Sequence, residues 1–269
     1  KKGIITDERL NEALTRIIGT KAALGLHKKA KNEIMMPKEE AMAKIGLEEN
    51  KAIAVEVADK GITLVKNTQD IFPISLEKHK RVLLVDVKGT EGGFGALIGA
   101  QGPKPSQVMK EMLEKEGFEV SIWESPMDKV MQLPVEERRA AIGSVYAAKR
   151  PISELTSKYD LIINLASVNP NTDQRIQWPA SKGTPDIPFY VNEVPTIFIS
   201  VQCPFHLADV PQVKTYINAY DNKDFTLQAL VDKMLGKSEF VGVSPVDAFC
   251  GLGDTRYGMD IKLTACAVN

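Results

Sequence analysis

Cysteine and histidine are scarce in this chain. The 269 residues include three cysteines, Cys203, Cys250 and Cys266, and three histidines. No two cysteines form a C-x-x-C pair, and the histidines form no H-x-x-x-H pattern. A structural zinc site needs such spacing, and an odd number of cysteines cannot all be bridged within one chain. We therefore expect neither a disulfide framework nor a metal site, and we expect no cofactor.

An excess of charge and a long apolar run are also absent. Lys and Arg total 34 and Asp and Glu total 35, which gives a net charge of −1. This balance gives no electrostatic reason to expect nucleic acid as a partner, and no apolar run is long enough to span a bilayer. The chain begins at Lys1 without an initiating Met and shows no signal peptide. We expect a fragment or a processed chain, and its compartment stays open between the bacterial cytoplasm and the cell envelope or secretion.

Short apolar strands alternate with helices over most of the chain. The predicted strands cover 62–66, 81–87, 119–124, 160–167, 196–201 and part of 212–220, and the predicted helices cover 106–118, 135–150 and 224–236. This alternation indicates a doubly wound, flavodoxin-like α/β sandwich with a mostly parallel sheet of about six strands. Further helices, at 7–24 and between 37 and 60, precede it as a helical linker.

The segment 85–106, VDVKGTEGGFGALIGAQGPKPS, is rich in glycine and follows a predicted strand. The glycines at 93, 95 and 99 are similar to a dinucleotide-binding fingerprint. Gly102, Pro103 and Pro105 intervene before the helix, so these glycines cannot direct its first amides at a pyrophosphate. We expect a loop that folds over a neighbour or a ligand, or a plain surface loop. Nucleotide binding is the weakest hypothesis.

A polar loop, NPNTDQRIQWP, follows the predicted strand at 160–167. Asp173, Arg175 and Trp178 give it the composition of a sugar site, because carboxylates bind hydroxyls and an indole stacks on a pyranose face. A glycosidase needs two carboxyl groups across the scissile bond, and Glu193 is the nearest candidate to pair with Asp173. No sequence rule joins that pair, so a structural role is the commoner outcome for each residue.

A serine or cysteine hydrolase is not supported. The chain has no G-x-S-x-G nucleophile elbow. His206 and Asp209 lie close together in PFHLADVP, and Cys203 lies three residues before the histidine. A histidine placed directly after a buried strand more often caps or packs, so we expect His206 to be structural and Cys203 to be a buried thiol.

Several segments together resemble glycoside hydrolase family 3. They are TDERLNEALTRIIGTKAALGL, AVEVADKGITLVKNTQDIFPIS, FHLADVPQVKTYINAYDN, LQALVDKMLGKSEFVGVSPVD and FCGLGDTR. The resemblance covers residues 4 to 257, in the right order and at the right spacing. QWP, VNEVPTIFISV and KTYINAY are similar to the bacterial two-domain β-N-acetylhexosaminidases of that family.

The resemblance implies a two-domain enzyme with an N-terminal (β/α)8 barrel and a C-terminal α/β sandwich. It assigns 1–50 to the helical end of the barrel plus a linker, 51–257 to the sandwich and 258–269 to a tail. The nucleophilic Asp and the Asp/His acid–base pair of the subgroup lie in the barrel, so no catalytic residue is expected in this chain. Some relatives carry an acid/base Glu in the sandwich, but the loop at 169–183 has no such Glu.

The partners implied are the missing barrel of the same polypeptide and a carbohydrate substrate. Six loop residues are expected to face the substrate or the barrel: Gly92, Gly93, Phe94, Asp173, Arg175 and Trp178. A stand-alone ligand-binding or interaction module is the alternative. The helix at 7–24 discriminates between the two, because an apolar face left exposed there indicates a missing partner domain.

Overall fold

The computed structural model describes residues 5–35, 39–89, 104–148, 150–168, 176–178 and 187–247. The chain divides into two compact units, Lys1–Ile53 and Ala54–Asn269. The first unit holds the helices α1 (Asp7–Ala23), η1 (Leu26–Lys28), α2 (Lys31–Met35) and α3 (Glu39–Met42). Helix α4 (Glu48–Gly61) runs across the division. Whether the domain boundary lies at residue 50, as the sequence predicts, stays a prediction.

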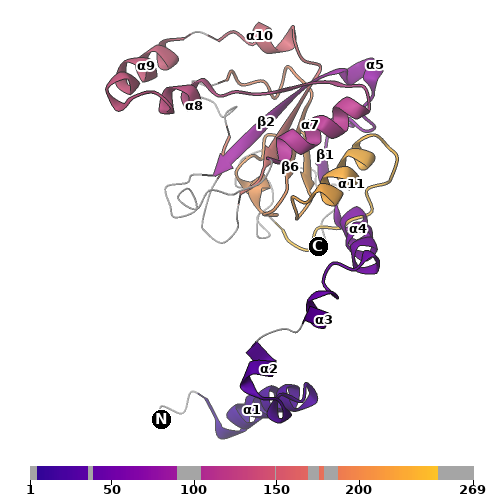
Figure 1. Ribbon diagram of the computed structural model, residues 1–269. Coiled ribbons are helices and arrows are strands. Elements are labelled where there is room, and N and C mark those ends of the chain that lie inside the picture. The colour runs from indigo at the N-terminus through magenta and orange to yellow at the C-terminus, as the bar shows by residue number, and fades with distance from the viewer. Residues whose placement is uncertain are drawn as a thin grey trace. The chain divides into compact units, whose positions relative to one another are not determined.

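The second unit contains a sheet and its covering helices (Figure 1). Its strands are β1 (Thr63–Asn67), β2 (Arg81–Gly89), β3 (Glu119–Ile122), β4 (Leu161–Ala166), β5 (Ile176–Gln177), β6 (Thr196–Ser200) and β7 (Thr215–Asn218). Its helices are α5 (Leu76–His79), α7 (Pro105–Lys115), α8 (Pro126–Met131), α9 (Val135–Ala147), α10 (Ser153–Thr156), η2 (His206–Ala208) and α11 (Asp224–Met234).

The strand order is β1-β7-β6-β4-β2-β3, and β5 pairs with β2 beside this path. All neighbours from β7 to β3 run parallel, whereas β1 is antiparallel to β7 and β5 is antiparallel to β2. The predicted doubly wound, mostly parallel sheet is therefore confirmed. From β2 the chain passes to the edge strand β3 and returns to β4 on the other side of β2, which places the switch point of the sheet between β2 and β4.

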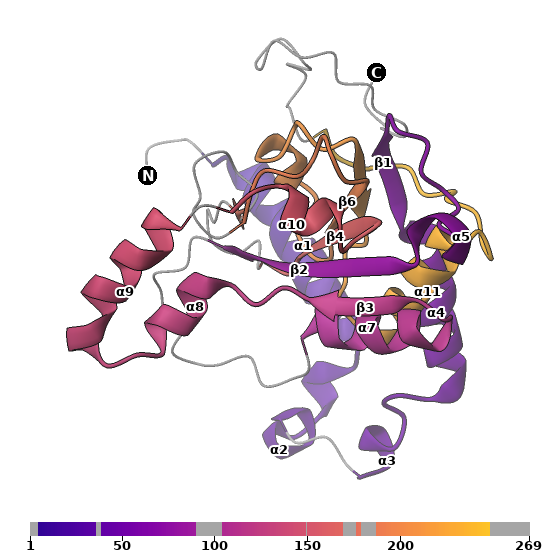
Figure 2. The ribbon, with the colours of Figure 1, turned by 90° about the horizontal axis from the view of Figure 1, so that it is seen from above.

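Both faces of the sheet are buried, which explains why the strands read as continuous apolar runs. In β4, Leu161, Ile163 and Leu165 pack on one face, and Ile162 and Ala166 pack on the other. The first face is covered by α7 and α11, which contact one another. The second is covered by α10 and by the segment from 187 to 213. Figure 2 shows α7 and α10 on opposite sides of β2.

Two glycines end the helices of the first face. Gly117 follows α7 with a φ of 95°, and Gly236 follows α11 with a φ of 75°. Both values lie in the left-handed region that glycine adopts without strain. At Gly236 a Cβ would also lie 3.1 Å from Cβ of Pro73, so the chain approaches closely there.

Candidate functional site

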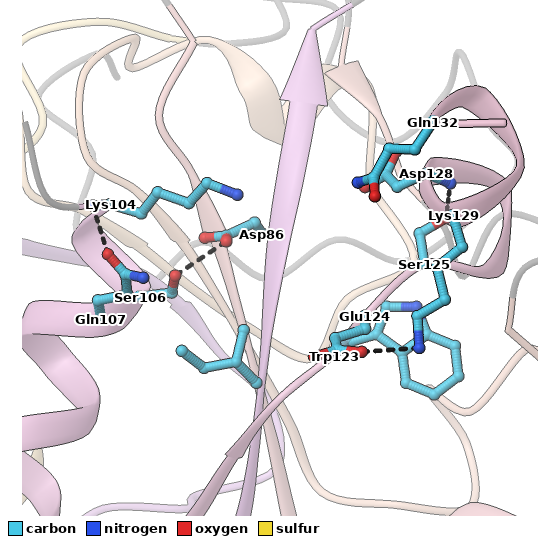
Figure 3. A pocket seen from close by; sticks show the side chains of 11 residues that line it. Asp86, Lys104, Ser106, Gln107, Trp123, Glu124, Ser125, Asp128, Lys129 and Gln132 are labelled. Atoms are coloured by element: carbon cyan, nitrogen blue, oxygen red, sulfur yellow. Dashed lines mark hydrogen bonds and ion pairs between the residues drawn. The ribbon is translucent and has the colours of Figure 1, made fainter. Parts of the chain in front are cut away.

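A pocket of about 360 Å³ opens at the carboxyl ends of β2 and β3. We call it the β2–β3 pocket. It is lined by Asp86, Lys104, Ser106, Gln107, Ile122, Trp123, Glu124, Ser125, Asp128, Lys129 and Gln132. One wall is the start of α7 and the other is α8 with the residues before it (Figure 3). In open parallel sheets, ligands bind outside the carboxyl ends of the strands.

The α7 wall is fixed by two local interactions. The hydroxyl of Ser106, which is fully buried, donates to Oδ2 of Asp86 at 2.8 Å. The backbone N–H of Lys104 donates to Oε1 of Gln107 at 3.3 Å, which closes the first turn of α7. Pro105 occupies the first helical position, where its missing N–H costs nothing. The pocket therefore has a carboxylate held in place at the end of β2.

The α8 wall carries an exposed ion pair and a helix cap. Nζ of Lys129 lies 2.7 Å from Oε2 of Glu124. The hydrogen bond from Lys129, followed by its charge, holds the pKa of the Glu124 carboxyl below its ordinary value. The hydroxyl of Ser125 accepts from the backbone N–H groups of Met127 and Asp128 and so caps α8. The Glu124 carboxylate at this wall is therefore charged and paired with Lys129.

A second polar group lies inside the core. Asn164 of β4 is fully buried, and its Oδ1 accepts from Nε1 of Trp178 at 2.9 Å and from the hydroxyl of Tyr190 at 2.6 Å. Burial raises the pKa of the Tyr190 phenol, which keeps it a neutral donor. The indole of Trp178 also meets Phe198 edge-on, with ring centroids 5.8 Å apart. Asn164 thereby joins two separate segments, those of Trp178 and Tyr190, to the sheet.

A serine–histidine pair lies at the carboxyl end of β6. Oγ of Ser200 is 3.0 Å from Nδ1 of His206 and donates to the carbonyl of Cys203. Since the hydroxyl proton is used there, Nδ1 of His206 must carry the proton that bonds Ser200. His206 is 2% exposed, and burial lowers its pKa to about 4. A neutral histidine and a buried serine form a structural contact, not a hydrolytic dyad open to substrate.

Known proteins are similar to this chain over almost its whole length. No family model matches it. A curated β-N-acetylglucosaminidase/β-glucosidase from Cellulomonas fimi is 36% identical over 259 residues, which is 95% of this chain. Among solved structures, the β-glucoside phosphorylase BglX is 36% identical over 94% of this chain, with a TM-score of 0.65. The chain belongs to glycoside hydrolase family 3. It corresponds to the C-terminal domain of that family.

This family 3 chain spans less than half the length of its relatives. It covers 42% of the curated enzyme and 41% of the phosphorylase. A solved family 3 β-N-acetylglucosaminidase from Paenibacillus, which is 19% identical with a TM-score of 0.48, is covered to 40%.

Five of the six residues expected to face substrate or barrel, Gly92, Gly93, Phe94, Asp173 and Arg175, lie outside the described residues. The sixth, Trp178, is 2% exposed and lies in the core beside Asn164. Its role toward a barrel or a substrate stays a prediction.

Other polar residues of this family 3 domain have defined contacts or exposure in the structure. Asp160, directly before β4, accepts from the backbone N–H of Arg81 at 2.8 Å and pairs with its guanidinium at 2.6 Å. His206 is buried and structural as expected, and its Nδ1 contacts Oγ of Ser200. The free thiol Cys203 is of intermediate exposure, so the expectation of a buried thiol was wrong. The helix α8, which forms a wall of the pocket, had no sequence prediction.

The carboxyl groups with displaced pKa values all favour the charged form. Among the described residues these are Glu56, Asp59, Glu124 and Asp160, and each has a lowered pKa with a cationic neighbour. The general acid of a glycosidase instead has a raised pKa.

Over the described ranges, no cluster of three potential metal ligands occurs and no helix is both long and apolar enough to cross a membrane.

Proposed function

We propose that this chain is the non-catalytic half of a retaining family 3 enzyme that acts on β-linked N-acetylglucosamine or glucose. The observation that carries the proposal is the 36% identity over 95% of the chain to the Cellulomonas fimi enzyme, whose name gives both sugars. The barrel of the same polypeptide would supply the nucleophile and the acid–base pair, and the sandwich would support that barrel and border the outer substrate site. The chain alone is then inactive.

The carboxyl groups of this chain support the proposal that the barrel supplies the catalytic groups. A retaining glycosidase uses two carboxyl groups about 5–5.5 Å apart, one of which must be protonated at the start of the reaction. Glu124 and Asp160 are bound to Lys129 and Arg81 and stay charged. Neither is suited to protonate a leaving-group oxygen.

The first helix supports a missing partner domain over a stand-alone module. Helix α1 buries none of its residues, and Leu10, Leu14, Ile17 and Ile18 are 50%, 43%, 53% and 60% exposed. These residues share one face, because they follow helical spacing. A continuous apolar face of this kind marks a surface that another element covers.

Two assays test the proposal. The purified 269-residue chain should not turn over the p-nitrophenyl β-glycosides of N-acetylglucosamine and glucose. The polypeptide read from the coding sequence upstream of Lys1 should turn over at least one of them with retention of configuration, followed by NMR. Turnover by the chain alone at a rate comparable with the longer polypeptide would overturn the proposal.

Phosphorolysis is a second candidate reaction. The solved relative at 36% identity is a β-glucoside phosphorylase. The longer polypeptide should be assayed with and without inorganic phosphate, and the product separated as free sugar or sugar phosphate. Free sugar at an unchanged rate in phosphate favours hydrolysis, whereas a phosphate-dependent sugar phosphate favours phosphorolysis.

A further inference from the structure

The β2–β3 pocket presents polar groups from opposite walls toward one space. Figure 3 shows the side chain of Lys104 reaching in from the α7 side and that of Gln132 from the α8 side, with Asp86 between them. Its volume, about 360 Å³, lies at the lower end of the roughly 300–1,000 Å³ usual for ligand pockets. We propose that this pocket binds a neutral saccharide unit of a β-linked oligosaccharide.

The charges on the lining residues favour a neutral ligand. Among the described residues that line the pocket, three are carboxylates, Asp86, Glu124 and Asp128, two are ammonium groups, Lys104 and Lys129, and none is an arginine. An anion such as a phosphate would meet a net negative lining, and such sites are usually built with arginine or with a cationic excess. A polyhydroxylated neutral molecule meets no such repulsion.

The polar groups that line the pocket are suited to hydrogen-bond the hydroxyls of a sugar. A hydroxyl both donates and accepts, so it suits carboxylates and amides placed side by side. The bond from Ser106 fixes the Asp86 carboxylate and uses only one of its roughly four acceptor positions. The amide of Gln132, at the end of α8, can donate as well as accept. Two adjacent ring hydroxyls can therefore be bound between the two walls.

Trp123 supplies an aromatic surface at the end of β3. It is partly buried against the core and also lines the pocket. An indole packs against the C–H groups of a pyranose ring, and ligand pockets commonly combine such an apolar surface with a few oriented polar groups. The same residue provides the signal for a binding experiment, since the chain has only one other tryptophan, Trp178, which is 2% exposed.

The test is a fluorescence titration of the purified chain with cellobiose and N,N′-diacetylchitobiose. We expect a saturable change in tryptophan emission with at least one of them, with a Kd on the order of 1 mM for a small polar ligand. Glycerol at matched concentration should give none. Trp123→Phe should abolish the change while Trp178 still reports that the fold is intact.

Two variants retain the tryptophan and test the polar contacts. Asp86→Asn keeps an oxygen for Ser106 but loses the charge, and should weaken binding about tenfold or more. Gln132→Ala should weaken it about threefold to tenfold. Gln228→Ala, at an exposed glutamine in α11, is the control and should leave the affinity unchanged. Far-UV circular dichroism verifies that each variant folds.

Three outcomes overturn the inference. They are the absence of a saturable change with both disaccharides, a change that persists in Trp123→Phe, and affinities of Asp86→Asn and Gln132→Ala equal to that of Gln228→Ala. The choice of β-linked probes rests on the proposed function. The titration needs no turnover, so a negative result leaves the proposed function standing, and an inactive longer polypeptide leaves a positive titration standing.

Discussion

The indole N–H of Trp178 donates to Oδ1 of Asn164, 2.9 Å away, inside the second face of the sandwich. Tyr190 donates to the same oxygen at 2.6 Å. One buried amide oxygen thus accepts hydrogen bonds from two aromatic side chains. These lie 14 and 26 residues after Asn164 in the sequence and contact β4 only in the folded chain. Because a buried donor without an acceptor is costly, the amide holds both segments in register with the sheet.

Asn164→Leu should destabilise the sandwich strongly. Leucine has a similar size but leaves both aromatic donors unsatisfied, each at about 1–3 kcal/mol, so we expect a loss of roughly 2–5 kcal/mol in the free energy of unfolding. Asn222→Ala, which removes an exposed side-chain bond to Ser167, is the control and should cost less than about 0.5 kcal/mol. Urea denaturation measures both, and equal midpoints would contradict the prediction.

A buried lysine anchors α11 to α4. Nζ of Lys233, whose side chain is fully buried, lies 3.0 Å from Oδ1 of Asp59 and donates to the carbonyl of Glu239 at 2.6 Å. Asp59→Ala leaves this ammonium group without its counter-charge. The full penalty of about 3–5 kcal/mol is reduced because Asp59 is 41% exposed to solvent, so we expect about 1–3 kcal/mol.

The control for this prediction is the ion pair between Lys60 and Glu56, one turn apart on the same helix. Both of its side chains are mostly exposed, so Lys60→Ala should produce no measurable change in the urea midpoint. If Asp59→Ala and Lys60→Ala shift the midpoint equally, the buried pair has no special role.

The sequence predicts the sheet well because its strands are buried on both faces. β4 and β6 are mostly apolar for that reason, and α7 and α11 keep a helical apolar spacing against them. Local patterns of this kind need no knowledge of the rest of the chain. The antiparallel pairing of β1 with β7 has no such local signal, because the partners are 148 positions apart at their closing pair Thr215–Asn67.

The polar sites are harder to predict, because their parts come from distant segments. The loop around Trp178 has the composition of an exposed sugar site, yet Trp178 lies in the core. Asn164, within the mostly apolar strand β4, accepts a hydrogen bond from its indole N–H there. Asp86 and Ser106 both belong to the glycine-rich segment that the sequence singles out. The opposite wall of their pocket is α8, which no motif marks.

His206 should give the sandwich a pH-dependent stability. Burial lowers its pKa to about 4, while an unfolded chain has a histidine pKa of about 6.5. The unfolded state therefore binds more protons between these values, and stability is fully present above about pH 6.5 and falls as the pH is lowered to about 4. The loss is at most about 3 kcal/mol, since one pKa unit corresponds to about 1.4 kcal/mol.

His206→Asn retains a donor toward Ser200 but does not titrate. It should flatten the fall in stability between about pH 6.5 and 4, measured by urea midpoints across that range. His79, whose pKa is also lowered by burial, is present in both proteins, so their difference reports His206. His27→Asn, at an exposed position, should keep the wild-type slope. A slope unchanged in His206→Asn would show that the histidine is not the titrating group.

The apolar face of α1 should make the chain bind hydrophobic dyes. Leu10, Leu14, Ile17 and Ile18 are exposed, and a surface of this kind binds 8-anilinonaphthalene-1-sulfonate or a second molecule when no partner covers it. Leu14→Gln with Ile18→Gln should lower dye fluorescence and reduce self-association in light scattering. Thr15→Gln with Arg16→Gln is the matched control and should change neither. Equal dye binding by both double variants would show that this face is covered within the chain, which would favour the stand-alone module.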